Sequence, residues 1–148
     1  MKTPRQGNLF AEEKELSAWE AADQADRLLA EVVFNIPVNT LFHYLIPDHL
    51  RDQVKPGARL KLPFGRGNQL QVGYCVGTRR FDEAFGERPP EISKIKEVFE
   101  VVDEAPLVNG GMLELTRWIA DYYLCGWGQV LESVIPAGVK RTRRGREW

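Results

Sequence analysis

The sequence is poor in the residues and segments that several protein classes need. Its 148 residues include two cysteines, Cys75 and Cys125, which lie far apart and outside any CxxC pattern. We expect two buried thiols rather than a disulfide, and no zinc site in this chain. No apolar run approaches the ~20 residues that cross a bilayer, and no basic stretch followed by an apolar one opens the chain. The sequence therefore predicts neither a membrane span nor a signal peptide.

Common catalytic motifs are also missing. There is no GxxxxGK[ST] pattern, so a phosphate-binding P-loop is not expected, and neither GxSxG nor HExxH occurs. Gly65-Arg66-Gly67 lacks the third glycine and the following helix of a dinucleotide-binding loop. The only histidines, His43 and His49, have no evident partners for a triad or a metal site. The sequence thus predicts a chain that is not an enzyme by itself.

Charge of either sign is concentrated at the ends of the chain. The formal net charge is −1, yet residues 11–31 are rich in Asp and Glu and residues 140–147 in Lys and Arg. Total charge therefore does not decide whether the protein binds nucleic acid. We interpret residues 1–15 as a disordered tail and residues 139–148 as a basic tail. Residues 16–30 are predicted to form an acidic helical extension, with Ser17 as its cap.

Between residues 31 and 102, short apolar runs are interrupted by proline and glycine. The runs predict five strands, at residues 32–36, 41–46, 58–63, 70–79 and 92–102. Residues 48–54 are expected to form a loop or one helical turn, and residues 81–90 a charged loop. Lys55-Pro56-Gly57 predicts a type II turn, and Gly73 and Gly77 suggest a bulge or a tight bend.

Residues 108–125 predict the clearest helix of the chain, with Asn109 as its cap. An apolar stripe recurs on it at helical spacing, the pattern of a helix that packs on a core. Its members are Met112, Leu115, Trp118, Ile119, Tyr122 and Tyr123. The predicted fold is a β-rich α+β domain: a small antiparallel, partly open β-barrel packed with a C-terminal amphipathic helix.

Basic and aromatic side chains recur on these strands. Alternation in residues 58–63 places Arg59 and Lys61 on the exposed face, and further cations follow at Arg66, Lys94 and Lys96. In the second strand, Phe42 and Tyr44 share one face and His43 takes the other. Small β-barrels bind single-stranded nucleic acid with such a combination, but solvated strand faces have the same composition. A protein-interaction scaffold, or nonspecific binding by the basic tail, is the alternative.

Five segments resemble one family in order and spacing. They are TLFHYLIP, KPGARLKLPFGR, VGYCVG, KIKEVFEVVDEAP and WIADYYLCGWGQVLESVIPAG, within residues 31–138. Together they are similar to the amino-terminal domain of the primosomal replication-restart helicase PriA. The resemblance implies a module that binds the 3′-hydroxyl end of the nascent leading strand at a stalled fork.

The resemblance also implies where other activities lie. ATP and zinc are expected only in the helicase part, which this chain lacks, so no cofactor is expected here. The implied partners are DNA with a forked or single-stranded 3′ end, and further other primosome proteins and the single-stranded DNA-binding protein. A cytoplasmic, nucleoid-associated location without membrane contact is implied as well.

Four positions of the chain match the family's binding residues. Phe42 corresponds to the aromatic residue, Gly65 to the glycine that lets a base approach the backbone, and Lys96 to the lysine of the late strand. His43 falls where the family has an acidic residue that contacts the terminal sugar hydroxyl. A neutral imidazole accepts through one nitrogen only, so hydroxyl recognition should be weaker and pH-sensitive. Tyr44, Lys61 and Arg66 complete the predicted DNA-binding set.

Overall fold

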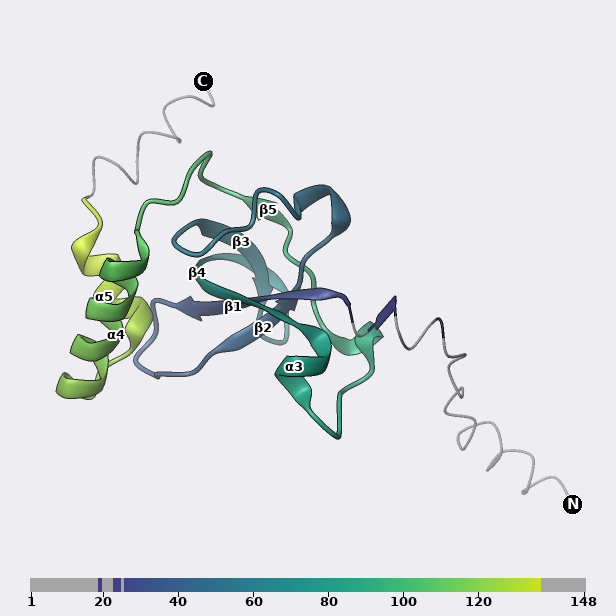
Figure 1. Cartoon of the computed structure of the whole chain (residues 1–148). Helices are drawn as coiled ribbons and strands as arrows, with labels where there is room; N and C mark the ends of the chain where they lie inside the picture. The colour runs from purple at the N-terminus through teal and green to yellow at the C-terminus, as the bar shows by residue number, and fades with distance from the viewer. Residues whose placement is uncertain (1–18, 20–22, 25, 137–148) are drawn as a thin grey trace, which may run out of the picture.

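Five strands form one antiparallel sheet of order β2-β1-β4-β3-β5 (Figure 1). The computed structural model describes residues 19, 23–24 and 26–136. The strands are β1 Leu28–Phe34, β2 Phe42–Leu45, β3 Arg59–Phe64, β4 Gln69–Arg80 and β5 Glu100–Val101. The predicted β-rich α+β class is confirmed.

The two edges of the sheet are joined by the segment that leads into β5. The Leu45 N–H donates to the Lys96 carbonyl and the Val98 N–H to the Leu45 carbonyl, both at 2.9 Å. The Phe99 N–H then donates to the Lys61 carbonyl of β3 at 3.0 Å. Residues 96–102 therefore pair first with β2 and then with β3, which rolls the sheet into a partly open barrel. We call the junction of Leu45 with residues 96–98 the seam.

Strand β1, between β2 and β4, is buried on both faces because its side chains alternate between two cores. Val32 and Phe34 point into the barrel, with Leu60 and Leu62 of β3. Val33 points the other way, into a cluster with residues of the C-terminal helices. The sheet thus has an inner core and an outer, helix-covered face.

Three α-helices and two short 3₁₀ turns complete the described fold. They are α3 Phe81–Phe85, α4 Gly110–Tyr123, α5 Trp127–Val134, η1 Asp48–Leu50 and η2 Ile92–Lys94. The Asn109 side chain accepts from the Met112 N–H at 2.8 Å, which confirms the predicted cap. Figure 1 shows α4 and α5 side by side at one end of the barrel and α3 at another part of its surface. Helix α5 approaches β1 so closely that a Cβ on Gly128 would lie 1.9 Å from the Phe34 carbonyl oxygen.

Several local predictions are confirmed. The Ala58 N–H donates to the Lys55 carbonyl at 3.1 Å and Gly57 has φ +94°, as a type II turn requires. The β1–β4 register shifts between Glu31 and Val32, opposite Gly77 and Cys75, and leaves a bulge in β4. Cys75 is buried and Cys125 half-buried, and both are free thiols.

The predicted helix over residues 16–30 is wrong at its C-terminal end. Residues 28–30 belong to β1, where Leu29 and Ala30 are fully buried between β2 and β4. Pairing on both sides outweighs the helix propensity of Leu and Ala. Trp19, Asp23 and Gln24 are helical, whereas the rest of that segment and the tails 1–15 and 139–148 lie outside the described residues.

Two predictions between residues 81 and 102 are also wrong. Residues 81–85 form α3 rather than loop, since Phe81 is buried and anchors the segment against the sheet. Residues 92–102 do not form one long strand: η2 comes first and β5 has only two residues. This segment changes its pairing partner at the seam, which interrupts the regular ladder.

Helix α4 packs with the opposite face to the one predicted. Leu115, Trp118, Tyr122 and Tyr123 of the expected stripe are half or more exposed, whereas Leu113, Thr116 and Ala120 are buried. The Thr116 hydroxyl accepts from the Trp127 indole N–H of α5 at 3.0 Å. Small residues let α4 and α5 approach closely, so the larger apolar residues are left on the outside.

Candidate nucleic-acid interface

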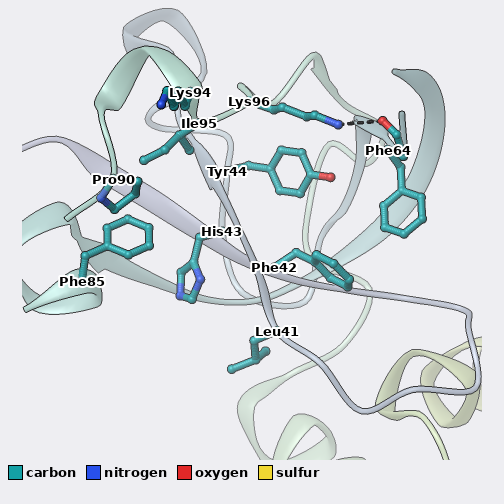
Figure 2. A pocket seen from close by; sticks show the side chains of 11 residues that line it. Leu41, Phe42, His43, Tyr44, Phe64, Phe85, Pro90, Lys94, Ile95 and Lys96 are labelled. Carbon is teal, nitrogen blue, oxygen red and sulfur yellow. Dashed lines mark hydrogen bonds between the residues drawn. The ribbon is translucent and has the colours of Figure 1, made fainter. Parts of the chain in front are cut away.

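An open pocket of about 500 Å³ lies at the seam, between β2 and the segment that precedes β5. Strand β2 and this segment are hydrogen-bonded to each other at Leu45 and move apart from there toward Phe42. A space of this size is ordinary for small-ligand sites. Its lining residues are Leu41, Phe42, His43, Tyr44, Phe64, Gly65, Phe85, Pro90, Lys94, Ile95 and Lys96, and all but Gly65 are labelled in Figure 2.

The pocket brings together most of the residues predicted from the sequence. Phe42, His43, Tyr44, Gly65 and Lys96 line it, although they come from three separate segments. Lys61 and Arg66 do not line it: Lys61 is half-buried on β3, and Arg66 is exposed in the turn after Gly65.

Packed aromatic rings form one wall of the pocket. The Phe42 ring meets Phe34 and Phe64 edge-on, with centroids 5.4 Å away in each case. Tyr44 is buried behind them, its hydroxyl donates to the Pro63 carbonyl at 2.8 Å, and burial raises its pKa to about 12. This wall is therefore a neutral surface of interlocked rings. Sequence reasoning missed Phe64, although it stands in the PFG run that the resemblance used.

Gly65 and Lys96 form the basic side of the pocket. The Lys96 ammonium donates to the Gly65 carbonyl at 2.8 Å, the dashed line in Figure 2. Gly65 has φ +76°, and no atom outside its chain neighbours lies within 4 Å of the position that a Cβ would take. An ammonium has three donors, so Lys96 keeps two for a ligand while the space beside Gly65 stays open.

His43 lies on the other face of β2, beside a carboxylate. Its Nε2 is 3.6 Å from Oε2 of Glu31, directly opposite on β1, and its ring meets Phe85 edge-on at 5.5 Å. Arg79 Nε lies 3.5 Å from the same Glu31 oxygen. A carboxylate is thus present next to position 43, one strand away from where the resemblance expects it.

The backbone of β2 presents polar groups to the pocket. The Ile46 N–H pairs toward β1, with the Leu28 carbonyl at 3.0 Å, whereas both backbone groups of Leu45 pair across the seam. Backbone groups alternate direction along an antiparallel strand, so those of His43 point the same way as those of Leu45. At His43, β2 has moved away from the segment that precedes β5, so the His43 N–H and C=O face the pocket.

The basic surface is smaller than the sequence predicted, because Arg59 is not on it. Arg59 is 6% exposed, and its guanidinium donates to Asp103 Oδ1 at 2.8 Å and Oδ2 at 3.0 Å. Its role is structural.

Three lining residues, Phe85, Pro90 and Ile95, had no site role in the sequence analysis, whereas Lys94 was expected as one of the cations of the basic face. Phe85 and Pro90 precede η2, Lys94 ends it and Ile95 follows it. The aromatic spacing in Phe81-Asp82-Glu83-Ala84-Phe85 is their only sequence feature that hinted at a packed helix rather than a loop.

The described residues contain neither a metal-binding cluster nor a membrane-spanning helix. No group of three or more His, Cys, Asp and Glu residues in that part of the chain could hold a metal ion. None of the helices described there is long and apolar enough to cross a membrane.

A small rolled antiparallel sheet with a pocket of rings, ammonium groups and free strand-edge groups belongs to the class of β-rich nucleic-acid-binding modules. Comparison with known proteins makes this class more specific. Residues 31–136 match the PriA family described as 3′DNA-binding domain (3′BD), and the chain belongs to that family.

Three relatives of the chain are each named replication restart protein PriA. The chain is 28% identical over 114 residues to the replication restart protein PriA of Bacillus subtilis, which covers 75% of the chain and 13% of the relative. It is 28% identical over 107 residues to PriA of Treponema pallidum (72% of the chain, 16% of the relative). For PriA of Haemophilus influenzae the identity is 28% over 112 residues (76% and 14%). The chain therefore spans about one seventh of the length of these relatives.

Proposed function

We propose that the pocket at the seam binds the 3′-hydroxyl end of a DNA strand, the nascent leading strand at a stalled replication fork. The observation that carries the proposal is the meeting of Phe42, His43, Gly65 and Lys96 in one pocket. Each corresponds to a binding position of the family. The geometry adds how each group would act.

A site for any strand end must read features that all nucleotides share. The rings of Phe42 and Phe64 offer packing to any base, since every base has an apolar face. The backbone groups of His43 and the Lys96 ammonium offer hydrogen bonds whether the terminal base is a purine or a pyrimidine. Binding independent of base identity follows.

Selectivity for a hydroxyl over a phosphate rests on His43 and Glu31. In this proposal the imidazole accepts a hydrogen bond from the terminal sugar hydroxyl, and the Glu31 carboxylate lies 3.6 Å from the imidazole Nε2. A 3′-phosphate would bring negative charge toward that carboxylate, which is half-buried and weakly screened. The hydroxyl is therefore the favoured end.

Fluorescence anisotropy with short single strands tests the proposal. Strands that end in a 3′-hydroxyl should bind about tenfold more tightly than the same strands with a 3′-phosphate, a difference of about 1.4 kcal/mol. Titrations at two salt concentrations separate this preference from nonspecific phosphate attraction. Equal affinity for both ends contradicts the proposal, and no binding at physiological salt favours a protein-interaction scaffold instead.

Three variants connect the measured preference to the pocket. Lys96→Ala should weaken binding about tenfold, whereas Lys55→Ala, an exposed lysine outside the pocket, should not. His43→Asp should preserve or strengthen binding because it restores a two-oxygen acceptor. Removal of residues 139–148 should keep the 3′-hydroxyl preference; its loss would assign the binding to the basic tail.

At the level of the longer relatives, we propose that the domain is the amino-terminal part of a primosome-assembly DNA helicase. ATP hydrolysis and zinc binding would then belong to other parts of such a protein. Other primosome proteins and the single-stranded DNA-binding protein are the proposed partners, in the bacterial cytoplasm at the nucleoid. Pull-down of the longer protein with and without residues 31–136 would test which contacts need this domain.

A further inference from the structure

The pocket has two halves, and three of the four family positions, Phe42, Gly65 and Lys96, lie in one of them. This terminal half is formed by Phe42, Tyr44, Phe64, Gly65 and Lys96. The flanking half is formed by Phe85, Pro90, Lys94 and Ile95, and His43 stands where the two halves meet. Figure 2 shows Phe85 and Pro90 on one side of the pocket, away from Phe42, Phe64 and Lys96, with His43 between Phe85 and Phe42.

The flanking half is a supported wall. The Phe81 N–H donates to the Arg27 carbonyl at 2.8 Å, and the Phe81 side chain is buried against Leu29 and Leu45. Its ring holds Phe85 edge-on at 5.2 Å, and Phe85 in turn meets His43 at 5.5 Å. The Phe85 ring is thus fixed in place by packing while it remains half-exposed at the pocket.

Lys94 adds an available cation to this wall. It is exposed in η2, and its side-chain ammonium makes no hydrogen bond or ion pair with the part of the chain that the structure describes. No Asp or Glu is among the residues that line the pocket. The lining therefore carries two ammonium groups, Lys94 and Lys96, and no carboxylate, a balance that suits a ligand with phosphate groups.

We propose that the flanking half binds the second nucleotide from the 3′ end. This proposal rests on the proposed function, since it needs the last nucleotide in the terminal half. The base packs against Phe85 and Pro90, and the Lys94 ammonium pairs with the phosphate on the 5′ side of that nucleotide. The ligand is then a single-stranded 3′ end whose last two bases are both unpaired, because a base held against Phe85 cannot remain stacked in a duplex.

Titrations with oligonucleotides of increasing length test the second subsite. A deoxynucleotide, a dinucleotide and a trinucleotide, each with a 5′-phosphate and a free 3′-hydroxyl, are titrated into the full chain and followed by NMR chemical shifts. The affinity should rise about tenfold from one nucleotide to two. Phe85→Leu, which keeps apolar packing but removes the ring, and Lys94→Ala should each remove most of that rise.

Matched controls make the result specific. Phe99→Ala removes another exposed ring and Lys55→Ala another exposed cation, both outside the pocket, and neither should change the rise. Phe85→Leu and Lys94→Ala should leave single-nucleotide binding unchanged. Lys94→Ala should also reduce the slope of log affinity against log salt concentration by about 0.7, the value for one phosphate contact on a single strand.

The outcomes separate this proposal from the proposed function. If the 3′-hydroxyl preference holds but Phe85→Leu and Lys94→Ala behave like their controls, the second subsite is wrong and 3′-end binding stands. If both variants weaken single-nucleotide binding equally, the two halves are one site and the proposal is again overturned. If the unaltered protein shows no 3′-hydroxyl preference, both proposals fail.

Discussion

At the scale of single residues, the buried Arg59–Asp103 pair is the most consequential polar contact in the described chain. Both side chains are 7% exposed, and Asp103 accepts the Arg59 backbone N–H at 3.0 Å as well as two guanidinium bonds. The bonds to Asp103 hold the pKa of Arg59 above its usual value. The pair ties the start of β3 to the chain just after β5. A buried charge with these partners is stable, and one without them is not.

Removal of one partner should therefore be costly. Asp103→Ala leaves the Arg59 guanidinium buried without its counter-charge, and we expect a loss of about 3–5 kcal/mol in the free energy of unfolding. Asp82→Ala is the control: Asp82 and Arg80 also form a pair, at 3.3 Å, but both are about half exposed, so a loss under about 1 kcal/mol is expected. Urea unfolding at neutral pH measures both. Similar losses for the two variants would contradict the assignment of Arg59 to the core.

At the scale of elements, α4 shows how a helix can pack by its smaller residues. Its outer face carries the Trp118 and Tyr122 rings, stacked on each other with centroids 5.2 Å apart. Its inner face meets α5 through Thr116 and Ala120. Stacking covers part of both rings, but Trp118 and Tyr122 remain 59% and 65% exposed, so this face is more exposed to water than the sequence predicted.

Two leucines of α4 provide a direct test. Leu113→Ala should destabilise the protein by about 2–3 kcal/mol, because Leu113 is 7% exposed and its removal leaves a cavity. Leu115→Ala, the same change two residues later at a position that is 50% exposed, should cost under about 1 kcal/mol. Thermal and urea unfolding compare them. The reverse order would restore the packing face predicted from the sequence.

The elements differ in how far their sequence determines them. The turn at Lys55–Ala58, the Asn109 cap and the bulge near Gly77 follow from local chemistry, and all three were predictable. The face of α4 was not, since periodicity reports where apolar residues lie and not which of them finds a partner. Arg59 was misplaced for a similar reason: its partner Asp103 is 44 residues away, and strand alternation alone cannot show such a pairing.

At the scale of the whole molecule, the terminal half of the pocket was predictable, whereas of the flanking half only the cation Lys94 was predicted, as part of a basic face. The terminal half combines short runs, around Phe42, Gly65 and Lys96, that keep a recognisable pattern. The flanking half exists only because α3 packs Phe81 under the sheet and turns Phe85 toward His43. That arrangement depends on the tertiary position of residues 81–95, for which the local sequence predicts only a charged loop followed by the start of a strand.

Hydrogen exchange across the molecule can show whether ligand and barrel act together. The Leu45 and Val98 amides close the seam beside the pocket, whereas the Cys75 amide bonds to the Ala58 carbonyl at 2.9 Å, outside the pocket lining. DNA with a 3′-hydroxyl should slow the exchange of the Leu45 and Val98 amides by local closure, and change that of Cys75 less. Equal slowing at all three sites, as global stabilisation alone produces, would contradict local closure.

The seam thus sets a mechanical property of the domain. A barrel whose last strand pairs briefly with one edge and then with the other has a weak line along which it opens first. If a strand end binds in the pocket as proposed, its contacts with both sides of the seam should raise the free energy of this local opening. Resistance of the seam to opening would then differ between the free and the occupied domain.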